Sequence, residues 1–153
     1  MGDPRGRCVC PPHRIESYRS RISGPLLDRI DLHVEVPAVT LEDLRGPRGE
    51  GSATVAARVR NARARQRERF DSTCPTPFNA ALDARGLQEA CPLSSSAQGL
   101  LDRAFHHLGL SARALHRILK VARTLADLEG SEDIKPGHVA EAIQYRALDR
   151  RVE

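Results

Sequence analysis

The sequence lacks the motifs with which most ATPases hold their nucleotide. Its 153 residues contain no G-x-x-x-x-G-K-[ST] loop, whose backbone amides would cradle phosphates, and no apolar strand ending in paired acidic residues that would hold a magnesium ion. We therefore expect that this chain by itself does not hydrolyse ATP.

Aromatic residues and long apolar runs are also scarce. Aromatics make up 3% of the chain and hydrophobic residues 40%, most of them Leu and Ala, which favours helices over a sheet sandwich. Few aromatics also argue against stacking platforms for single-stranded nucleic acid. No stretch is long enough to span a bilayer, and the first thirty residues lack a signal peptide's apolar run. We expect a soluble, cytoplasmic protein with no membrane partner.

Cysteine is too infrequent for a secreted disulfide scaffold, with four residues in the whole chain. Cys8 and Cys10, with His13 nearby, suggest zinc, because thiolates at short spacing suit that metal. Three candidates do not complete a four-ligand structural site, and an unmetallated chain end is the favoured alternative. Cys74 and Cys91 lie far apart with no clear base alongside, so we interpret both as structural.

The N-terminal third reads as irregular structure, short helices and one strand. Pro11 and Pro12 exclude a regular helix within residues 1–14. A short helix is expected over 15–21, and a further turn over 26–29. The alternation of apolar and polar residues predicts a half-buried strand over 30–36, which needs partner strands elsewhere.

From residue 79 onward the pattern is entirely helical. Serines, glycines and a proline stand where helices begin and end, notably Ser111, Gly109, Gly130 and Pro136. Helices are predicted over 79–89, 94–107, 111–128 and 136–149. In the third of these, apolar residues recur at helical spacing and form a broad core face.

A helix rich in arginine is predicted over 52–70, with Ser52 as its N-cap, and it follows a flexible connector over 37–51. Six arginines opposed by Glu68 alone give the helix a charge of +5. Contact with nucleic-acid phosphates and pairing with acidic patches of another domain or subunit are equally weighted explanations. The DNA-binding candidates are Arg58, Arg60, Arg63, Arg65, Arg67 and Arg69.

Four segments in order carry a resemblance to a known family. They are R-I-S-G-P-L-L-D-R-I-D at 21–31, L-S-A-R-A at 110–114, A-R-T-L-A-D-L-E-G at 122–130 and H-V-A-E-A-I-Q-Y-R at 138–146. Together they resemble the C-terminal part of the magnesium-chelatase-like AAA+ ATPases, within them the ComM/YifB group linked to DNA branch migration in natural transformation. The resemblance covers nearly the whole chain and is weakest at 37–51 and 71–93.

The resemblance implies roles for individual residues. Arg29 would be the arginine finger that reaches the terminal phosphate held by a neighbouring subunit, with Asp28 and Asp31 orienting it. Arg113 would be the second sensor arginine, at the phosphate-facing start of a lid helix. In related full-length proteins a further cysteine pair lies upstream, so Cys8 and Cys10 would be half of a zinc-ribbon-like insert. The alternative is that Asp28, Arg29 and Asp31 form surface ion pairs that contribute little energy.

The fold class that follows is mainly α. A remnant of the α/β AAA+ core occupies 1–36, a linker with the basic helix 37–78, and a helical lid of about four helices 79–153. The intact protein is expected to be a homo-oligomeric, hexameric motor that uses ATP and Mg²⁺ and acts on DNA. The alternatives are a metal-chelatase-type motor acting on a protein partner and a non-enzymatic helical DNA- or protein-binding module.

Overall fold

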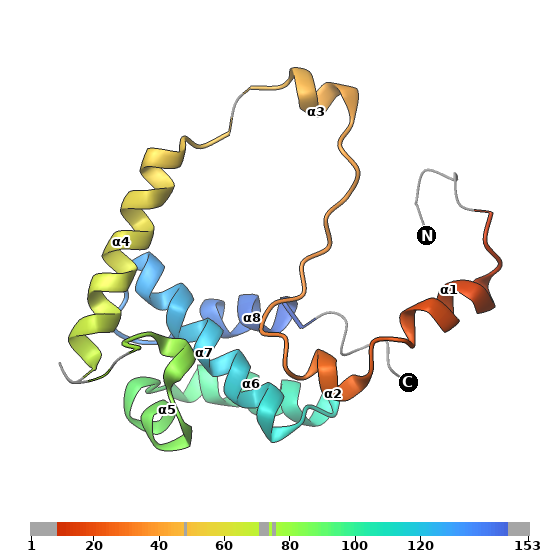
Figure 1. Cartoon of the computed structure of the whole chain (residues 1–153). Helices are drawn as coiled ribbons and strands as arrows, with labels where there is room; N and C mark the ends of the chain where they lie inside the picture. The colour runs from red at the N-terminus through yellow and green to blue at the C-terminus, as the bar shows by residue number, and fades with distance from the viewer. Residues whose placement is uncertain (1–8, 48, 71–73, 75, 147–153) are drawn as a thin grey trace.

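The computed structural model describes residues 9–47, 49–70, 74 and 76–146. Helices dominate these residues, as predicted, and the only β-type pairing among them is an isolated bridge between Leu93 and Ile134. The elements, shown in Figure 1, are α1 (Pro12–Arg19), α2 (Gly24–Leu27), α3 (Leu41–Arg45), α4 (Ser52–Arg69), the 3₁₀ helix η1 (Asn79–Ala81), α5 (Ala84–Ala90), α6 (Ser95–Leu108), α7 (Ala112–Glu129) and α8 (Pro136–Gln144).

Helix α7 is the centre of the fold, and it packs against α4, α5, η1 and α8, while α6 packs against α8. Its boundaries are set by local chemistry. The Ser111 hydroxyl accepts a hydrogen bond from the amide of Ala114, and Gly130 ends the helix at a φ of 80°. Ser94 and Gly109 do the same for α6. The helices predicted over 94–107 and 111–128 are confirmed to within a residue.

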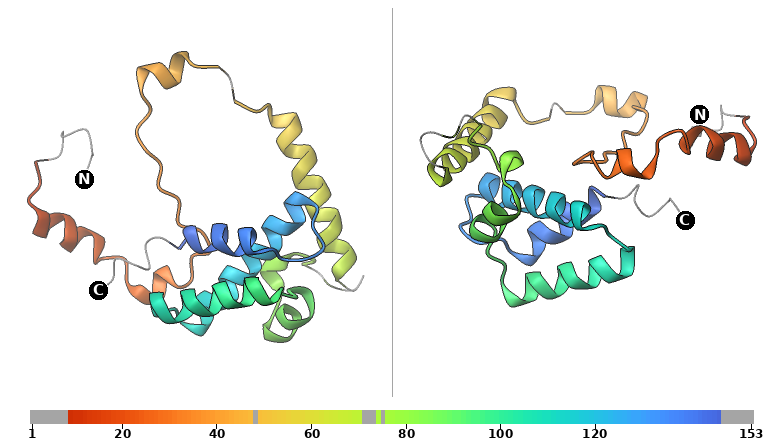
Figure 2. Two further views of the ribbon diagram at one scale, coloured as in Figure 1. Left: turned by 180° about the vertical axis from the view of Figure 1, so that it is seen from behind. Right: turned by 60° about the horizontal axis from the view of Figure 1, so that its bottom comes forward.

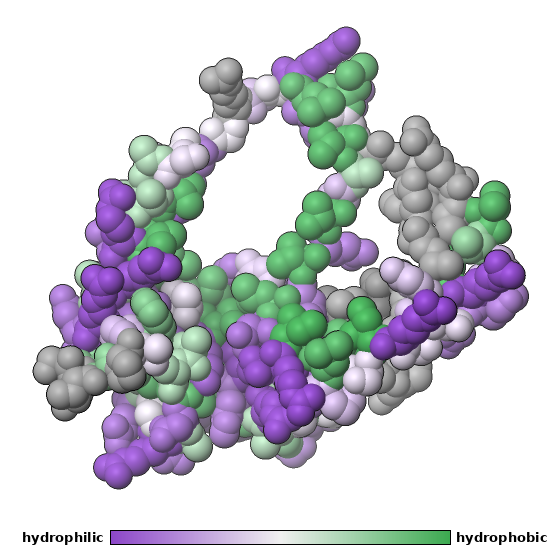
Figure 3. Space-filling model, in the orientation of Figure 1, coloured by the Kyte–Doolittle hydropathy of each residue, from purple (hydrophilic) through white to green (hydrophobic). Residues whose placement is uncertain are grey.

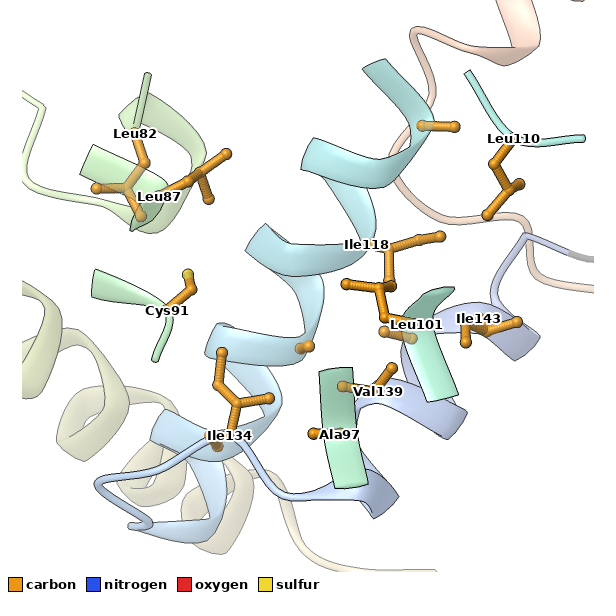
Figure 4. Packing of buried hydrophobic residues seen from close by; sticks show 14 residues of the cluster. Leu82, Leu87, Cys91, Ala97, Leu101, Leu110, Ile118, Ile134, Val139 and Ile143 are labelled. Atoms are coloured by element: carbon orange, nitrogen blue, oxygen red, sulfur yellow. The ribbon is translucent and has the colours of Figure 1, made fainter. Parts of the chain in front are cut away.

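The hydrophobic core lies between α5, α6, α7 and α8, where aliphatic side chains meet (Figure 4). Ile118, Ala122 and Ala126 of α7 are fully buried, as their helical spacing predicted. Leu101 of α6 and Val139 of α8 point toward Ile118 from the other side. Each large aliphatic side chain buried here stabilises the fold by about 1.5–3 kcal/mol.

Two helices of this unit differ from prediction. The helix expected over 79–89 is divided into η1 and α5, because Asp83 caps α5 by accepting a hydrogen bond of 2.7 Å from the amide of Gly86. Helix α8 begins at Pro136, as predicted, and ends at Gln144. Residues 147–149, the end of its predicted range, lie outside the described residues.

Helix α1 and the arch over residues 34–47, which carries α3, extend away from the helical unit, as the two views of Figure 2 show. Helix α1 begins at Pro12, so the prediction of irregular chain was wrong for residues 12–14. Proline is favoured at a first helical position because its missing N–H would be unpaired there anyway. Helix α3, capped by Thr40, was not predicted. Helix α4 matches its prediction, except that Gly51 rather than Ser52 is the N-cap.

The strand predicted over 30–36 does not form in this structure. The chain there pairs with no strand in the described part of the molecule, and Val34 and Val36 are 65% and 82% exposed. His33, on the polar side of the alternation, is the buried residue, and its amide donates to the carbonyl of Tyr145. Figure 3 shows apolar side chains exposed along the segment that leads from here to α3. Alternation predicts two faces, but a strand also needs a hydrogen-bonded neighbour.

None of the helices in the described part of the chain is long and apolar enough to cross a membrane.

Candidate functional site

The turn that carries Arg29 is docked on the helical unit. Helix α2 lies beside the turn between α6 and α7, where Gly24, Pro25 and Leu27 line a small hollow together with residues 108–111. Leu27 is 8% exposed and is the apolar anchor of this contact. The segment from α2 to His33 therefore forms a junction with the start of α7 and the end of α8.

Asp28 joins this junction to the N-terminus of α7. Its carboxylate accepts a hydrogen bond of 3.0 Å from the hydroxyl of Ser111, the residue that caps α7. Its other oxygen lies 3.7 Å from Nη2 of Arg146, whose side chain is 1% exposed. A negative charge at a helix N-terminus is favourable, because the helix dipole is positive there.

Asp31 makes a second link, to α7 itself. Its carboxylate forms an ion pair with Nη1 of Arg117, one turn along the helix from Arg113. Arg146 also donates from Nη1 to the carbonyl of Ile30. The residues on both sides of Arg29 are thus held by arginines of the helical unit.

Asp28 and Asp31 were predicted to orient Arg29, and the structure gives them other partners. In the described residues, the Arg29 guanidinium makes one hydrogen bond, 3.3 Å from Nη1 to the carbonyl of Pro25, and the side chain is exposed. The two aspartates fix the backbone that carries Arg29 and leave its guanidinium directed to solvent. This arrangement allows Arg29 to contact a group outside the chain.

Arg113 is the second residue of α7 and is exposed. Across the described ranges, its guanidinium has no hydrogen bond or ion pair. The helix N-terminus beside it, expected to face phosphates, instead meets the carboxylate of Asp28 through Ser111. Phosphate contact at this end of α7 would therefore depend on the guanidinium of Arg113 more than on the helix dipole.

The arginine-rich helix α4 is fixed to α7 by a buried polar cluster. Arg69 binds Asp127 through two hydrogen bonds, 2.6 Å from Nη2 and 3.1 Å from Nη1, and Nη1 also donates to Asn79. The Asp127 side chain is 1% exposed and that of Arg69 23%. A two-point arginine–carboxylate pair has both favourable charge and a defined geometry.

Asn79 and Arg123 complete this cluster. The Asn79 amide donates to Asp127 at 2.8 Å and to Thr124 at 3.0 Å. Arg123, with a side chain 2% exposed, donates to Asp127 at 3.2 Å and to the carbonyls of residues 131 and 132. Each charge in the cluster is matched by an opposite charge or a carbonyl, which a buried ion pair requires in order to be tolerated.

Sequence reasoning placed Arg69 among the DNA-binding candidates, and the structure uses it in this cluster instead. Arg58 pairs with Glu50 at 2.8 Å, and the guanidinium of Arg65 lies beside Gly130. The guanidinium carbon of Arg63 lies 5.6 Å from the ring centre of Phe78. Arg60 and Arg67 are exposed, and within the described chain neither side chain forms a hydrogen bond or ion pair.

Three charged residues of the junction and of the buried cluster were missed as functional positions: Arg123, Asp127 and Arg146. Arg123 and Asp127 are spaced i,i+4, but both fall outside the face of the helix that was predicted to be core, so the hydrophobic pattern did not mark them as buried. These two residues are buried because α4 packs against a second side of α7, which the pattern of apolar residues did not predict.

The cysteines provide little support for a metal centre. Cys8 lies outside the described residues, and Cys10 is partly exposed. The described residues contain no group of three or more His, Cys, Asp or Glu side chains able to hold a metal ion. Zinc binding by Cys8 and Cys10 stays a prediction. Burial raises the pKa of the Cys91 thiol to about 11, which suits the structural role expected of it.

Comparisons with known proteins identify the family of the chain. The family model described as magnesium chelatase, subunit ChlI C-terminal, matches residues 49–146, and the model described as magnesium chelatase, subunit ChlI, matches residues 1–44. Residues 45–48, from the last residue of α3 toward the start of α4, separate the two matches.

Curated relatives match nearly the whole chain. Competence protein ComM of Haemophilus influenzae is 43% identical over 144 residues, which are 93% of this chain and 27% of that protein. Protein YifB of Escherichia coli is 44% identical over 144 residues, 92% of this chain and 27% of its own length. A protein of Mycobacterium tuberculosis is 32% identical over 151 residues. The chain spans about a quarter of the length of these relatives, and it belongs to the magnesium chelatase ChlI family, in which ComM and YifB are its relatives.

Proposed function

We propose that this chain is the lid and phosphate-sensing portion of an oligomeric AAA+ motor that acts on DNA. The observation that supports this most directly is the junction between the Arg29 turn and α7. Asp28 and Asp31 attach that turn to the helix that presents Arg113, and both guanidinium groups are left exposed. Two exposed arginines held on the same junction suit the recognition of a nucleoside triphosphate.

In this proposal Arg29 acts on the nucleotide of a neighbouring subunit. A planar guanidinium with a permanent charge stabilises the charge that develops on a transferring phosphoryl group, and such a contribution reaches about 10³–10⁵ in rate. Arg113 contacts phosphate from the lid and reports its presence through α7. ATP and Mg²⁺ bind in the nucleotide-binding part of the motor, and no residue of this chain is assigned to Mg²⁺, since Asp28 and Asp31 are already paired with arginines.

DNA is the proposed substrate because of helix α4 and because a relative carries the name competence protein. A metal-chelatase-type motor that acts on a protein partner is the second candidate, favoured by the names of the two matching family models. The two candidates differ in one measurable respect: only the first predicts that DNA stimulates ATP turnover.

The test uses a chimera in which this chain replaces the matching segment of the Haemophilus influenzae relative. Arg29→Ala is expected to lower ATP turnover by about 10³-fold or more. Arg45→Ala, at an exposed arginine of α3, which lies away from α2 and α7 in Figure 1, is the control and should turn over ATP like the unmutated chimera. Turnover that survives Arg29→Ala would refute the finger assignment.

Mixing subunits tests whether Arg29 acts on a neighbour. Arg29→Ala subunits are combined with subunits whose phosphate-binding lysine has been replaced, each inactive alone. In mixed oligomers an intact nucleotide site can meet an intact Arg29 from the next subunit, so activity should return. Failure to recover activity in oligomers shown to be mixed would contradict action in trans. Adding duplex or four-way-junction DNA to the same assay decides between the DNA and chelatase candidates.

A further inference from the structure

The arginines of α4 form two rows on different sides of the helix. At 3.6 residues per turn, Arg58, Arg65 and Arg69 fall within about 40° of one another around the helix axis. The other three arginines fall within about 60° of one another on another side. We call these three, Arg60, Arg63 and Arg67, the outer row.

The first row is occupied by contacts within the chain. Arg69 is bound to Asp127 in the buried cluster, and Arg58 pairs with Glu50. The Arg65 guanidinium lies against Gly130, since a Cβ atom added to that glycine would be 3.3 Å from Nη2 of Arg65. These residues lie toward the side of α4 that packs against α7, where Ala62 and Gln66 are buried.

The outer row is exposed and keeps its charge. In the described residues, the only contact recorded for its guanidinium groups is that of Arg63 over the Phe78 ring. The single carboxylate in α4, Glu68, is about 100° around the helix from Arg67. Three positive charges therefore face solvent with no acidic neighbour on their own side of the helix.

We propose that the outer row of α4 binds the phosphate backbone of duplex DNA without reading its sequence. From Arg60 to Arg67 the row extends about 10 Å along the helix, which is about three phosphate spacings of one strand measured along the duplex axis. This inference rests on the proposed function, because it identifies the surface through which the motor portion contacts its DNA substrate. Hydrophilic side chains extend along α4 in Figure 3.

The residues between these arginines favour a nucleic-acid partner over an acidic protein. The outward side of α4 contains the outer row together with Ala53, Ala56 and Ala64, all exposed, and its one exposed aliphatic neighbour is Val59, beside Arg63 and 39% exposed. Energetically important protein contacts depend on large anchors that enter desolvated pockets. Phosphate contacts need charge and reach, and they carry no sequence information.

The experiment compares two triple variants of this chain that lose the same charge. Arg60→Ala with Arg63→Ala and Arg67→Ala removes the outer row. The matched control combines Arg58→Ala and Arg65→Ala with Arg85→Ala, an exposed arginine of α5 paired with Glu89. Both leave Arg69 and its cluster intact, and far-UV circular dichroism checks that each variant keeps its helix content.

Binding to a labelled duplex is measured by fluorescence anisotropy between 50 and 200 mM salt. Three phosphate contacts correspond to a slope of about 2.7 in log K against log salt, or about 40-fold in affinity over this range. Relative to the unmutated chain, this slope should be smaller by about 2 to 3 in the outer-row variant and by less than about 1 in the control. Replacing the outer row by lysines should retain most of the slope, because lysine binds phosphate as a point charge. Two duplexes of unrelated sequence should bind equally.

Two results would overturn the inference. Equal losses in the two triple variants would show that net charge, and not the outer row, binds DNA. Binding of an acidic polypeptide in place of duplex DNA, abolished in the outer-row variant, would make the row a protein contact. Neither result affects the assignment of Arg29, which ATP turnover in the chimera judges separately.

Discussion

Replacing Asp127 by asparagine should strongly destabilise the chain. The substitution keeps the shape of the side chain but removes the negative charge that Arg69 and Arg123 share. Breaking a buried ion pair from one side costs about 3–5 kcal/mol, because the partner charge is left uncompensated. Arg69 is 23% exposed and can regain some hydration, and Arg123 keeps its two carbonyl partners, so we expect the lower end, about 3 kcal/mol.

Urea unfolding of the 153-residue chain, followed by circular dichroism, measures this loss. A decrease of about 3 kcal/mol in the free energy of unfolding corresponds to roughly 12–24 °C in Tm for a helical unit of this size. Arg85→Ala is the control, since its i,i+4 pair with Glu89 is exposed and screened by solvent, and its loss should leave the free energy of unfolding nearly unchanged.

A double-mutant cycle identifies the partner. Arg69→Ala and Asp127→Asn combined should cost less than the sum of the two single changes, with a coupling of about 0.5–3 kcal/mol. If Asp127→Asn lowers the free energy of unfolding by less than about 1 kcal/mol, the cluster does not fix α4 to α7 and the reasoning fails.

Three further predictions concern single contacts. Gly130→Ala should lower the free energy of unfolding by about 1 kcal/mol, because φ is 80° and the new Cβ would meet Arg65; an unchanged urea midpoint would refute this. Cys91 should react with iodoacetamide at pH 8 at least about tenfold more slowly than an exposed thiol. Since burial raises its pKa to about 11, the stability it contributes should fall as the pH rises from about 9 toward 11, and equal stability at pH 8 and 10.5 would contradict that. Asp31→Arg or Arg117→Asp alone should lower the free energy of unfolding by roughly 0.5–1 kcal/mol, and the two changes together should restore it. A double variant as unstable as the sum of the single ones would argue against the pair.

Helix boundaries were predictable where local chemistry fixes them. Ser94 and Ser111 begin α6 and α7, and Gly109 and Gly130 end them, because capping hydrogen bonds and left-handed glycines involve residues only a few positions apart. The family was likewise accessible from four short segments. The prediction of a strand over 30–36 was wrong, because a strand forms only beside a hydrogen-bonded neighbour, and an alternating pattern does not show whether one is present.

The candidate site divides in the same way. Sequence alone determined that α4 carries six arginines against one glutamate, and that Arg29 and Arg113 stand in motifs of a nucleotide-sensing family. Only the tertiary structure decided which of these charges are available. Arg69 is neutralised by Asp127, 58 residues away in sequence, while Asp28 and Asp31 turn to Arg146 and Arg117 and leave Arg29 exposed. The physical reason is that a side chain's charge is set by its residue type, whereas its partner is set by whatever packing brings within a few ångströms.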